Sequence, residues 1–310
     1  MRVLVTGANG FVGAALTTRL LGERRYAVIG AVRDASAKLP ALVTRAEVGP
    51  LGPETDWRPA IGHVDTVVHL AARVHMMSEA IRNPLAEYRR VNVAGTAALA
   101  RQAAAAGVKR FVFLSSVKVN GESGRYTEAD PPAPEDAYGI SKHEAEAALR
   151  AIAKDTGMDV VIIRPPLVYG PGVRANFLAL MRAVSRGIPL PLGAVNNRRS
   201  LVALSNLVDF IITCIDHPAA ANETFLVSDG EDLSTTDLIR RLAGAMGRPA
   251  RLLPVPESVL IAGAALLGRR DIAQRLLGTL QVDTSKAGRL LGWVPPITVD
   301  EGLRLAVAAL

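Results

Sequence analysis

The stretch MRVLVTGANGFVG, residues 1–13, decides the fold of this chain. A short apolar strand, residues 3–5, runs directly into a turn with Gly7, Gly10 and Gly13, and a helix is expected to follow. A dinucleotide fingerprint requires this order of strand, glycine turn and helix. The first glycine permits the tight turn, the second lets the backbone approach a pyrophosphate, and the third allows close helix–sheet packing. The phosphates would lie at the helix N-terminus.

The same alternation of strand and helix continues along the first half of the chain. Apolar, β-branched segments separated by helices indicate a parallel sheet that is covered on both faces. The sequence therefore predicts an α/β fold, a Rossmann-like doubly wound parallel sheet. Strands are expected at 3–5, 27–32, 66–70, 110–114, 159–163 and 224–227, and helices at 11–21, in the Ala-rich stretch ending near 107, and up to about 154.

The pattern loosens after Arg164, where prolines and glycines cluster at 165–172 and 187–193. The last third of the chain is mainly helical in pattern. We expect an NAD(P)-binding domain over 1–165, to which the chain returns at about 201–228. A smaller, mainly helical substrate lobe would comprise 166–200 and 229–310.

Composition limits the class of protein. The chain has 310 residues, of which 49% are hydrophobic, so it is globular rather than disordered. With Cys214 alone no intrachain disulfide can form, and no signal peptide is visible, so a cytoplasmic protein is expected. The longest apolar run, residues 259–268, is shorter than the ~20 residues of a spanning helix. It is predicted to be a buried helix of the second lobe, without stable membrane insertion.

The formal net charge of +7 comes mostly from arginine. These arginines are scattered and are not interleaved with aromatic residues, so nucleic acid is not the expected partner. A small anionic substrate explains the sign of the charge equally well.

The stretch YGISK, residues 138–142, carries the chemistry. Tyr138 and Lys142 are four residues apart on a predicted helix, so both side chains lie on one face. An unperturbed tyrosine has a pKa of about 10, and a nearby lysine cation favours the phenolate. The pair Ser115-Ser116 precedes this helix and offers a hydroxyl that could polarise a carbonyl oxygen. Together these residues form the layout of a redox site.

The end of the second strand bears on the choice of cofactor. A carboxylate at this position holds the ribose 2′-hydroxyl of NAD, whereas an arginine accommodates the 2′-phosphate of NADP. Arg33 directly follows the predicted strand and could accommodate the 2′-phosphate of NADP. Asp34 lies one residue beyond the position of a carboxylate that would hold the ribose of NAD. The cofactor is expected to be NADP or NAD, with NADP favoured.

Ordered motifs along almost the whole chain resemble those of the extended short-chain dehydrogenases/reductases that act on nucleotide sugars, the NAD(P)-dependent nucleotide-sugar epimerase/dehydratase family. TGANGFVG matches T-G-x-x-G-F-x-G, and YGISK matches the catalytic helix. Further matches are HLAA at 69–72, VNVAGT at 91–96, FVFLSS at 111–116 and RPPLVYGPG at 164–172. These motifs in order are together far more specific than any one of them, and the resemblance implies an enzyme with a UDP-sugar substrate.

The resemblance also implies roles for single residues. Ser116 would hydrogen-bond the reacting sugar oxygen, Tyr138 would be the general acid/base, and Lys142 would hold the nicotinamide ribose and lower the pKa of the tyrosine. The implied cofactor-binding residues are Gly7, Asn9, Gly10, Phe11, Val12, Gly13, Arg33, Leu70, Ala71, Ala72, Asn92, Ser115, Tyr138, Lys142 and Pro165. The implied substrate-binding residues are Ser116, Lys118, Tyr138, Asn176 on the diphosphate, Leu190 beside the uracil, Arg199 as pyrophosphate clamp, and Arg275.

Two polar residues outside the catalytic group have structural interpretations. Asn92 could join the central helix to the sheet, a structural role as often as a catalytic one. His69 ends a buried strand and is expected to be a packed or backbone-bonded histidine rather than a metal ligand. No metal site is predicted. Lys118 either touches substrate or faces solvent.

The resemblance leaves three reactions to choose from. In 4,6-dehydratases an Asp-Glu pair follows the catalytic residue, whereas here Val117-Lys118 stand in those positions, so dehydration lacks its proton carriers. Epimerases usually carry a tyrosine where this chain has Asn120. The segment SSVKVNGE resembles that of enzymes of bacterial polysaccharide assembly that form UDP-N-acetylquinovosamine by reducing a 4-keto sugar. This resemblance favours reduction of a UDP-4-keto-6-deoxy-N-acetylhexosamine for surface polysaccharide synthesis.

The alternative is a UDP-glucose or UDP-N-acetylglucosamine 4-epimerase with tightly bound NAD. A second alternative, a non-catalytic NADP-binding regulator, conflicts with the presence of the Tyr-x-x-x-Lys pair. A homodimer is expected through the helix that carries this pair and its Ala-rich neighbour near residues 94–107.

Overall fold

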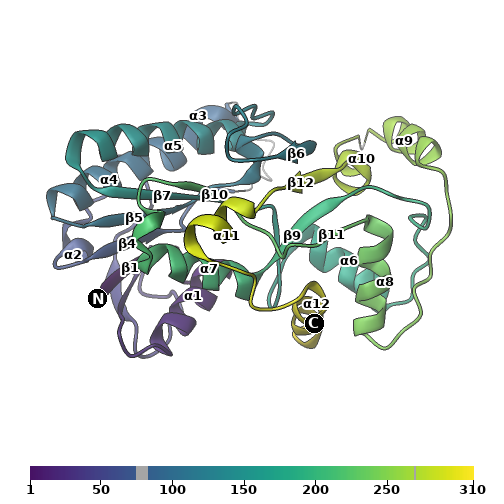
Figure 1. The fold of residues 1–310 in the computed structure, drawn as a ribbon, viewed down its shortest axis with the longest axis horizontal. Coiled ribbons are helices and arrows are strands. Elements are labelled where there is room, and N and C mark those ends of the chain that lie inside the picture. The colour runs from purple at the N-terminus through teal and green to yellow at the C-terminus, as the bar shows by residue number, and fades with distance from the viewer. Residues whose placement is uncertain (75–82, 269) are drawn as a thin grey trace.

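The computed structural model describes residues 1–74, 83–268 and 270–310. Its centre is a seven-stranded sheet in which every pairing is parallel (Figure 1). The strands are β1 (Arg2–Thr6), β2 (Ala27–Val32), β3 (Thr44–Glu47), β4 (Thr66–His69), β5 (Arg110–Leu114), β7 (Asp159–Arg164) and β10 (Thr224–Leu226). Their order is β10-β7-β5-β4-β1-β2-β3, and it confirms the predicted Rossmann-like α/β fold.

The strand order reverses at β1, which lies between β2 and β4. In such sheets ligands bind in the crevice beyond the carboxyl ends of the strands, at this switch point. The register aligns Thr6 with His69 and His69 with Phe113. The glycine turn after β1, the HLAA segment after β4 and the serine pair after β5 therefore meet at one edge of the sheet.

Helices cover both faces of this sheet because its strands are apolar on both sides. Along β1, Val3 and Val5 pack with one group of helices and Leu4 with the other, as the two-residue period of a strand requires. One face is covered by α1 (Phe11–Leu21) and α7 (Leu204–Asp216), the other by α4 (Thr96–Ala105) and α5 (Ala137–Thr156). Figure 1 shows these two helical layers on opposite sides of the sheet. The shorter elements around the main sheet are α2 (Arg58–Ile61), α3 (Pro84–Tyr88), the π-helix η1 (Arg89–Gly95), the 3-10 turns η2 (Val117–Val119) and η3 (Pro218–Ala220), and α11 (Ser285–Leu291).

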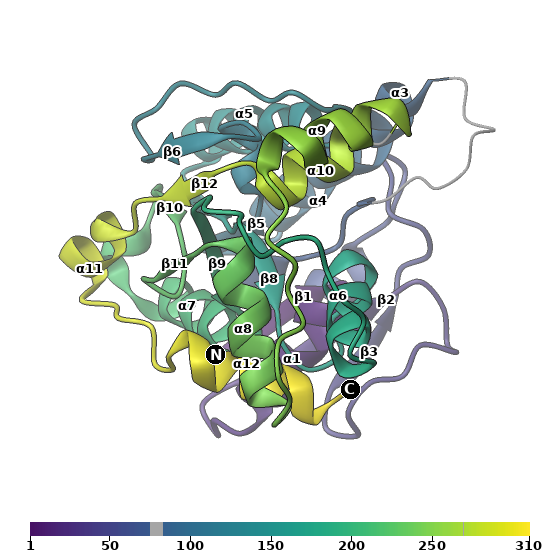
Figure 2. The same cartoon turned by 90° about the vertical axis from the view of Figure 1, so that its right-hand side faces the viewer.

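A second, smaller sheet lies beside the first, with the order β11-β9-β12-β6 and with β8 paired to β9. Its strands are β6 (Gly124–Tyr126), β8 (Leu167–Tyr169), β9 (Arg199–Ala203), β11 (Asp232–Leu233) and β12 (Leu280–Val282). The helices around it are α6 (Ala175–Ser185), α8 (Thr235–Ala245), α9 (Glu257–Leu266), α10 (Arg270–Leu277) and α12 (Val299–Ala308). Figure 2 shows α6, α8 and α12 gathered around this sheet. The chain leaves the main sheet after β7 and rejoins it at β10; the bounds of the two predicted domains stay a prediction.

One expectation about the second lobe is wrong. The apolar run at 259–268 forms most of α9 and the turn after it, but α9 has no buried residue. Leu266 is 88% exposed and Leu267 is 78% exposed. In the described parts of the chain, no helix combines the length and apolar character that crossing a membrane requires.

Candidate active site

The glycine turn forms a cradle in which side chains do not fit. Gly7 has a φ of +66°, and a β-carbon there would lie 3.0 Å from the backbone nitrogen of Ala71. A β-carbon at Gly13 would collide with the carbonyl oxygen of Gly7 and lie 2.9 Å from the α-carbon of Ala8. Gly10 is the N-cap of α1 and supplies no side-chain cap. The first turn of α1 therefore keeps backbone N–H groups for an anion, and this cradle fits a dinucleotide pyrophosphate.

The remaining residues predicted to bind the cofactor surround this cradle. Asn9 is exposed on the turn, and Phe11 and Val12 open α1 half-buried. Leu70, Ala71 and Ala72 follow β4 and are half-buried. The N–H groups of Leu70 and Ala71 donate to Thr6 Oγ1 at 3.2 and 3.1 Å, which ties the ends of β1 and β4 together.

His69 is fully buried beneath this crossing. Its Nδ1 lies 2.7 Å from Thr6 Oγ1 and its Nε2 lies 2.9 Å from Thr96 Oγ1. Burial, with a smaller effect of the Lys142 charge, lowers the pKa of His69 to about 3, so the ring is neutral. It is a packed histidine as expected, although its partners are hydroxyl groups rather than backbone.

The loop after β2 has Arg33 as its first residue, where the sequence placed it. The Arg33 side chain is exposed. The next residue, Asp34, accepts hydrogen bonds from the Ser36 hydroxyl and from the Ser36 N–H at 3.0 Å, and these bonds lower the pKa of its carboxyl group. The Asp34 carboxylate thus stabilises the loop in which it lies through its hydrogen bonds with Ser36.

The two serines after β5 differ in how deeply they are buried. Ser115 is 3% exposed, and its hydroxyl donates to Glu146 Oε1 at 2.6 Å. Ser116 is half-buried and caps η2, accepting from the Lys118 N–H at 3.3 Å. Ser116 is thus the more exposed of the pair, and its contact with the reacting sugar oxygen stays a prediction. Pro165, at the end of β7, accepts from the Val117 N–H at 3.0 Å and holds this segment in place.

The helix α5 carries Tyr138 in its first turn. Asp136 caps the helix by accepting from the Gly139 N–H at 2.6 Å. A β-carbon at Gly139 would lie 2.7 Å from the Lys118 carbonyl oxygen, so glycine is what lets α5 start directly beside η2. The ring of Tyr138 packs edge-on against Tyr88, with centroids 6.0 Å apart. Tyr138 therefore stands close to the segment that carries Ser116.

Lys142 lies one turn further along α5 and is 2% exposed. Its ammonium donates to the Leu114 carbonyl at 2.7 Å and lies 4.3 Å from the centre of the Phe113 ring. Burial lowers the pKa of Lys142 to about 7, partly offset by the charge of Glu146. The pKa of Tyr138 is raised, first by burial and then by the charges of Asp136 and Tyr88. In the protein chain by itself the effect of burial on the Tyr138 pKa dominates, and the lowering of that pKa by Lys142 stays a prediction.

A buried ionic network that the sequence analysis missed lies directly beneath these residues. Glu146 is fully buried and accepts from Arg164 Nε at 2.9 Å and Arg164 Nη2 at 2.6 Å. Arg164 Nη1 in turn donates to Asn120 Oδ1 at 3.0 Å. The spacing from Lys142 to Glu146, one helical turn on the same face, was the signal that could have revealed it.

This network changes the interpretation of Asn120. The residue is 1% exposed, and its side-chain oxygen satisfies a buried guanidinium. Its identity is therefore explained by packing beneath the site, and it has little weight as an argument against epimerisation.

Lys118 and Asn92 both brace α5. Lys118 is half-buried, and its ammonium donates to Asp136 Oδ2 at 2.6 Å and to Glu122. Burial alone would lower the pKa of Lys118, but these two carboxylates outweigh it and raise the pKa. Asn92 lies in the π-helix, where its amide bonds both backbone groups of Arg73 and donates to Ser141 Oγ at 3.0 Å. Asn92 thus joins α5 to the segment after β4, and irregular helical turns of this kind are frequent at functional sites.

The predicted substrate residues are spread over the second lobe. Arg199 opens β9, is half-buried, and donates to the Gly278 carbonyl at 2.8 Å; burial lowers its pKa. Asn176 is exposed at the start of α6, and Leu190 is half-buried and bridged to Leu252. Arg275 lies in the last turn of α10. Arg199 and Arg275 thus lie on either side of the turn between α10 and β12, whereas Asn176 and Leu190 come from other segments.

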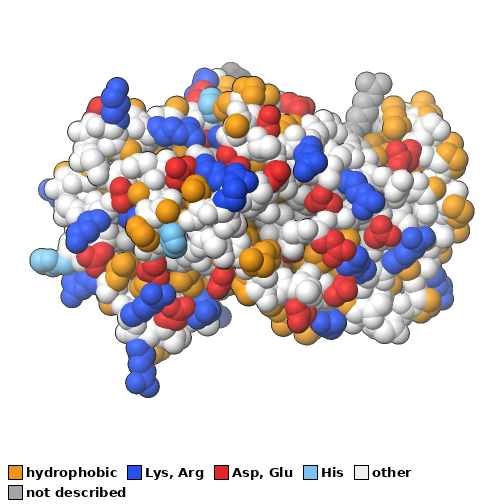
Figure 3. Space-filling model, in the orientation of Figure 1, with side chains coloured by type: hydrophobic (Ala, Val, Ile, Leu, Met, Phe, Trp, Pro, Cys, Tyr) orange, Lys and Arg blue, Asp and Glu red, His pale blue; other side chains and the backbone are white. Residues whose placement is uncertain are grey.

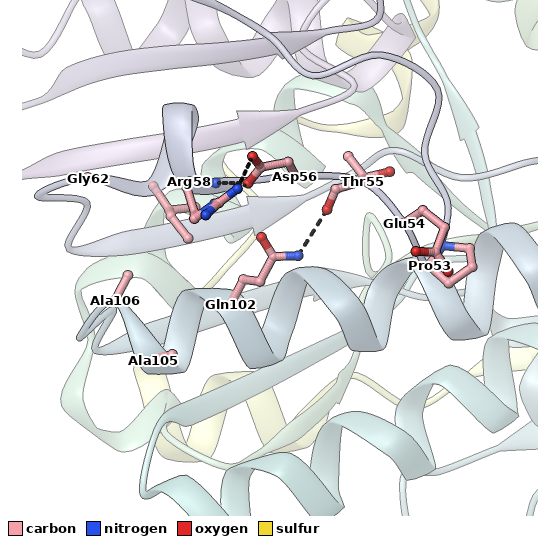
Figure 4. A pocket seen from close by; sticks show the side chains of 10 residues that line it. Pro53, Glu54, Thr55, Asp56, Arg58, Gly62, Gln102, Ala105 and Ala106 are labelled. Carbon is pink, nitrogen blue, oxygen red and sulfur yellow. Dashed lines mark hydrogen bonds and ion pairs between the residues drawn. The ribbon is translucent and has the colours of Figure 1, made fainter.

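A surface hollow near the loop before α2 is separate from this site. Figure 4 shows it between that loop and the end of α4, where Gln102 Nε2 donates to the Thr55 carbonyl at 2.9 Å. The Arg58–Asp56 pair lies on its rim. None of the residues predicted for catalysis or binding lines it, so the hollow is distinct from the predicted site.

Comparisons with known proteins agree with this arrangement. Residues 3–228 match the model of the NAD dependent epimerase/dehydratase family. The chain is 51% identical over 312 residues to a UDP-glucose 4-epimerase of Vibrio cholerae, covering 99% of this chain and 94% of that protein.

Two solved structures share the fold. One is MoeE5 in complex with UDP-glucose and NAD, at 26% identity and a TM-score of 0.79, covering 100% of this chain and 98% of that one. The other is the UDP-glucuronic acid 4-epimerase of Bacillus cereus in complex with NAD, at 23% identity and a TM-score of 0.80 with the same coverage. The matched family model spans the glycine cradle, the serine pair and the Tyr138–Lys142 helix. This chain therefore belongs to the NAD dependent epimerase/dehydratase family and is an enzyme of the extended short-chain dehydrogenase/reductase type.

Proposed function

We propose that this enzyme is a 4-epimerase of a UDP-linked hexose or N-acetylhexosamine, with NAD as its resident cofactor. The observation that carries the proposal is the 51% identity to a UDP-glucose 4-epimerase over nearly the full length of both chains. The 4-ketoreductase that the sequence analysis favoured is not confirmed, and the epimerase alternative fits this relative better. The non-catalytic regulator has no support, because the chain belongs to a family of enzymes.

The glycine cradle supports a bound dinucleotide. Gly7, Gly10 and Gly13 leave room for a pyrophosphate, and the uncapped first turn of α1 offers its N–H groups. A dinucleotide held there would supply the acceptor for the C4 hydride and the donor for its return to either face of the ketone. The preference for NADP that Arg33 suggested stays a prediction, and a titration of both cofactors against the wild type and Arg33→Ala decides it.

The protein side chains would transfer the proton and orient the sugar. Tyr138 would take the proton of the C4 hydroxyl as hydride leaves and give it back as hydride returns. Ser116, the more exposed serine, would hydrogen-bond the same oxygen and fix its position. Lys142, held at the end of β5, would bind the nicotinamide ribose and supply positive charge near the phenol.

The second lobe would hold the nucleotide. Arg199, whose guanidinium is already fixed by the Gly278 carbonyl, would clamp the pyrophosphate, with Arg275 on the neighbouring turn. Asn176 would bind the diphosphate and Leu190 would lie by the uracil. An epimerase must let the ketosugar turn while the nucleotide stays bound, and a grip on the diphosphate permits that rotation.

Two features favour this reaction over its neighbours. Val117 is buried and Lys118 is paired with Asp136 and Glu122, so the segment after Ser116 contributes no carboxylate for the loss of water. Asn120 is engaged beneath the site by Arg164, so its departure from the usual tyrosine no longer argues for a reductase.

The test is to incubate the purified enzyme with UDP-glucose and, separately, UDP-N-acetylglucosamine, without added cofactor. We expect the C4 epimer to form with no net change in the absorbance of reduced nicotinamide. Tyr138→Phe is expected to lower kcat by about 10²-fold or more, since general acid/base catalysis contributes 10²–10⁴-fold.

Tyr26→Phe is a matched control, because it removes a hydroxyl that bonds Asp216 away from the site. Consumption of NADPH or NADH with a 4-keto sugar, with no epimer from either UDP-sugar, would establish the reductase instead.

The expected homodimer stays a prediction, and sedimentation at micromolar concentration tests it.

A further inference from the structure

An exposed apolar cluster covers α9 and the segments that flank it, and we call these residues the apolar tip. Other exposed large hydrophobic side chains of the second lobe, such as Val294 (73%) and Leu305 (47%), are scattered, whereas the two most exposed ones follow one another here. The members and their exposed fractions are Leu253 (51%), Val259 (56%), Ile261 (52%), Leu266 (88%) and Leu267 (78%).

The helix α9 is apolar on almost every side. After Glu257 and Ser258 it contains apolar residues only, and none of them is buried. Leu260 packs inward on the small core around Val184 and Ile239, and α10 lies against the helix. A helix that is apolar all round is normally enclosed by protein or by lipid. Among the described residues, only those on its inner side cover it.

The tip protrudes from one end of the molecule. Figure 1 places α9 at the end farthest from the strands of the main sheet, and Figure 3 shows hydrophobic side chains gathered on that end. A protruding helix presents a convex surface. A stable interface between two copies needs about 800 Å² of closely fitted surface on each, which a narrow convex end supplies poorly, whereas an apolar helix needs no fitted partner surface to lie in a bilayer interface.

The charge of the sequence around the apolar tip also favours a bilayer as the surface that it contacts. The sequence from 248 to 275 contains five arginines and only two carboxylates, Glu257 and Asp271. Arg248 and Arg251, which precede Leu253, are exposed in the structure. Apolar side chains bordered by basic ones are the pattern of helices that lie in the headgroup region of anionic membranes.

We propose that the apolar tip binds reversibly to the surface of an anionic bilayer, with α9 lying in the interface. The ten residues of α9 extend about 15 Å, half of the ~30 Å hydrocarbon thickness, so the helix lies on the membrane and does not span it. The chain continues from α10 to Gly278, whose carbonyl holds Arg199. Bound in this way, the second lobe faces the bilayer while the main sheet stays in water.

The experiment is co-sedimentation of the full chain with phosphatidylcholine vesicles that contain about 30% phosphatidylglycerol or none. We expect the wild type to pellet with the anionic vesicles and to be released by high salt or by omission of the anionic lipid. The double variant Leu266→Glu/Leu267→Glu is expected to lose about tenfold or more in vesicle partitioning. The matched control is Leu42→Glu, because Leu42 is 79% exposed on the loop between β2 and β3.

Two further measurements keep the result unambiguous. Turnover of UDP-sugar in solution is expected to be unchanged in all variants, which separates this proposal from that of the reaction. Light scattering reports the oligomeric state. If the wild type does not pellet, or if the control and the double variant pellet alike, the proposal is overturned. It is also overturned if the double variant only splits an oligomer, because the tip then contacts a second copy.

Discussion

The buried pair of Glu146 and Arg164 offers the sharpest test of how the catalytic helix is held. We consider Glu146→Gln, which keeps the size of the side chain and removes its charge. In the wild type the carboxylate accepts two bonds from Arg164, one from Ser115 at 2.6 Å and one from Arg150 at 3.1 Å. A glutamine amide offers one oxygen, and its NH₂ group would face these donors.

The size of the effect follows from burial. Glu146 is 0% exposed and Arg164 is 3% exposed, so water cannot replace the lost partner. Breaking a buried pair from one side costs about 3–5 kcal/mol, because the remaining charge is left uncompensated. That loss is a large share of the about 5–15 kcal/mol that stabilises a native protein. In urea it corresponds to a midpoint lower by about 1 M or more.

The pH dependence of this difference has a definite sign. Burial alone would raise the pKa of Glu146, but the bonds and charges of Arg164, with Ser115 and Arg150, outweigh burial and lower it. A carboxyl group with a lowered folded-state pKa stabilises the protein fully above its unfolded pKa and loses that contribution as the pH falls through the folded pKa. The difference in the free energy of unfolding between the wild type and Glu146→Gln is therefore constant near neutral pH and becomes smaller in acid.

The assay is urea unfolding followed by circular dichroism at several pH values. Asp56→Asn is the control, because Asp56 pairs with Arg58 on the surface, where the two side chains are 49% and 84% exposed, and it should leave the midpoint unchanged. If Glu146→Gln unfolds at the same urea concentration as this control, the reasoning that a buried ionic network supports α5 is wrong.

Three other substitutions test the site. Gly13→Ala places a β-carbon against the Gly7 carbonyl and should remove co-purifying cofactor as measured by absorbance, while secondary structure by circular dichroism is retained. Lys118→Met removes the ion pair to Asp136 at the start of α5, so we expect kcat to fall several-fold with a smaller change in KM; an unaltered kcat would count against a positioning role. Lys142→Met removes a lysine whose pKa is about 7 in the folded protein and 10.5 unfolded. The unfolded wild type binds the extra proton between these values, so wild-type stability rises with pH across that window and the variant lacks this slope in urea unfolding.

The main sheet was predictable because its signals are local. The segment that begins at Arg2 indicates a strand, a turn and a helix within a few residues. The helix predicted at 11–21 has these same bounds in the structure. The strands at 27–32 and 110–114 are likewise bounded as predicted. Each is apolar on both faces, which is what a central parallel strand requires.

The elements that were missed depend on contacts between distant residues. The strand β3, TRAE, is short and polar, and it is recognisable only because it pairs with β2 at the edge of the sheet. In the small sheet, β12 pairs with β6, although the two strands are more than 150 residues apart in sequence. The run at 259–268 predicted a helix correctly, but no sequence window states whether other elements cover it.

Asn120 shows why a single departure from a family pattern is weak evidence about the reaction. Ser116, Tyr138 and Lys142 are needed alike for reduction and for epimerisation, because both move one hydride and one proton at C4. The difference between the reactions lies in whether the ketosugar can turn and whether the cofactor stays bound. Those properties belong to the whole lobe and cradle, so similarity over the full length of a chain informs them better than one position does. Asn120 is held by a hydrogen bond from Arg164 beneath the site. Its identity is therefore explained by packing and says little about which reaction the enzyme catalyses.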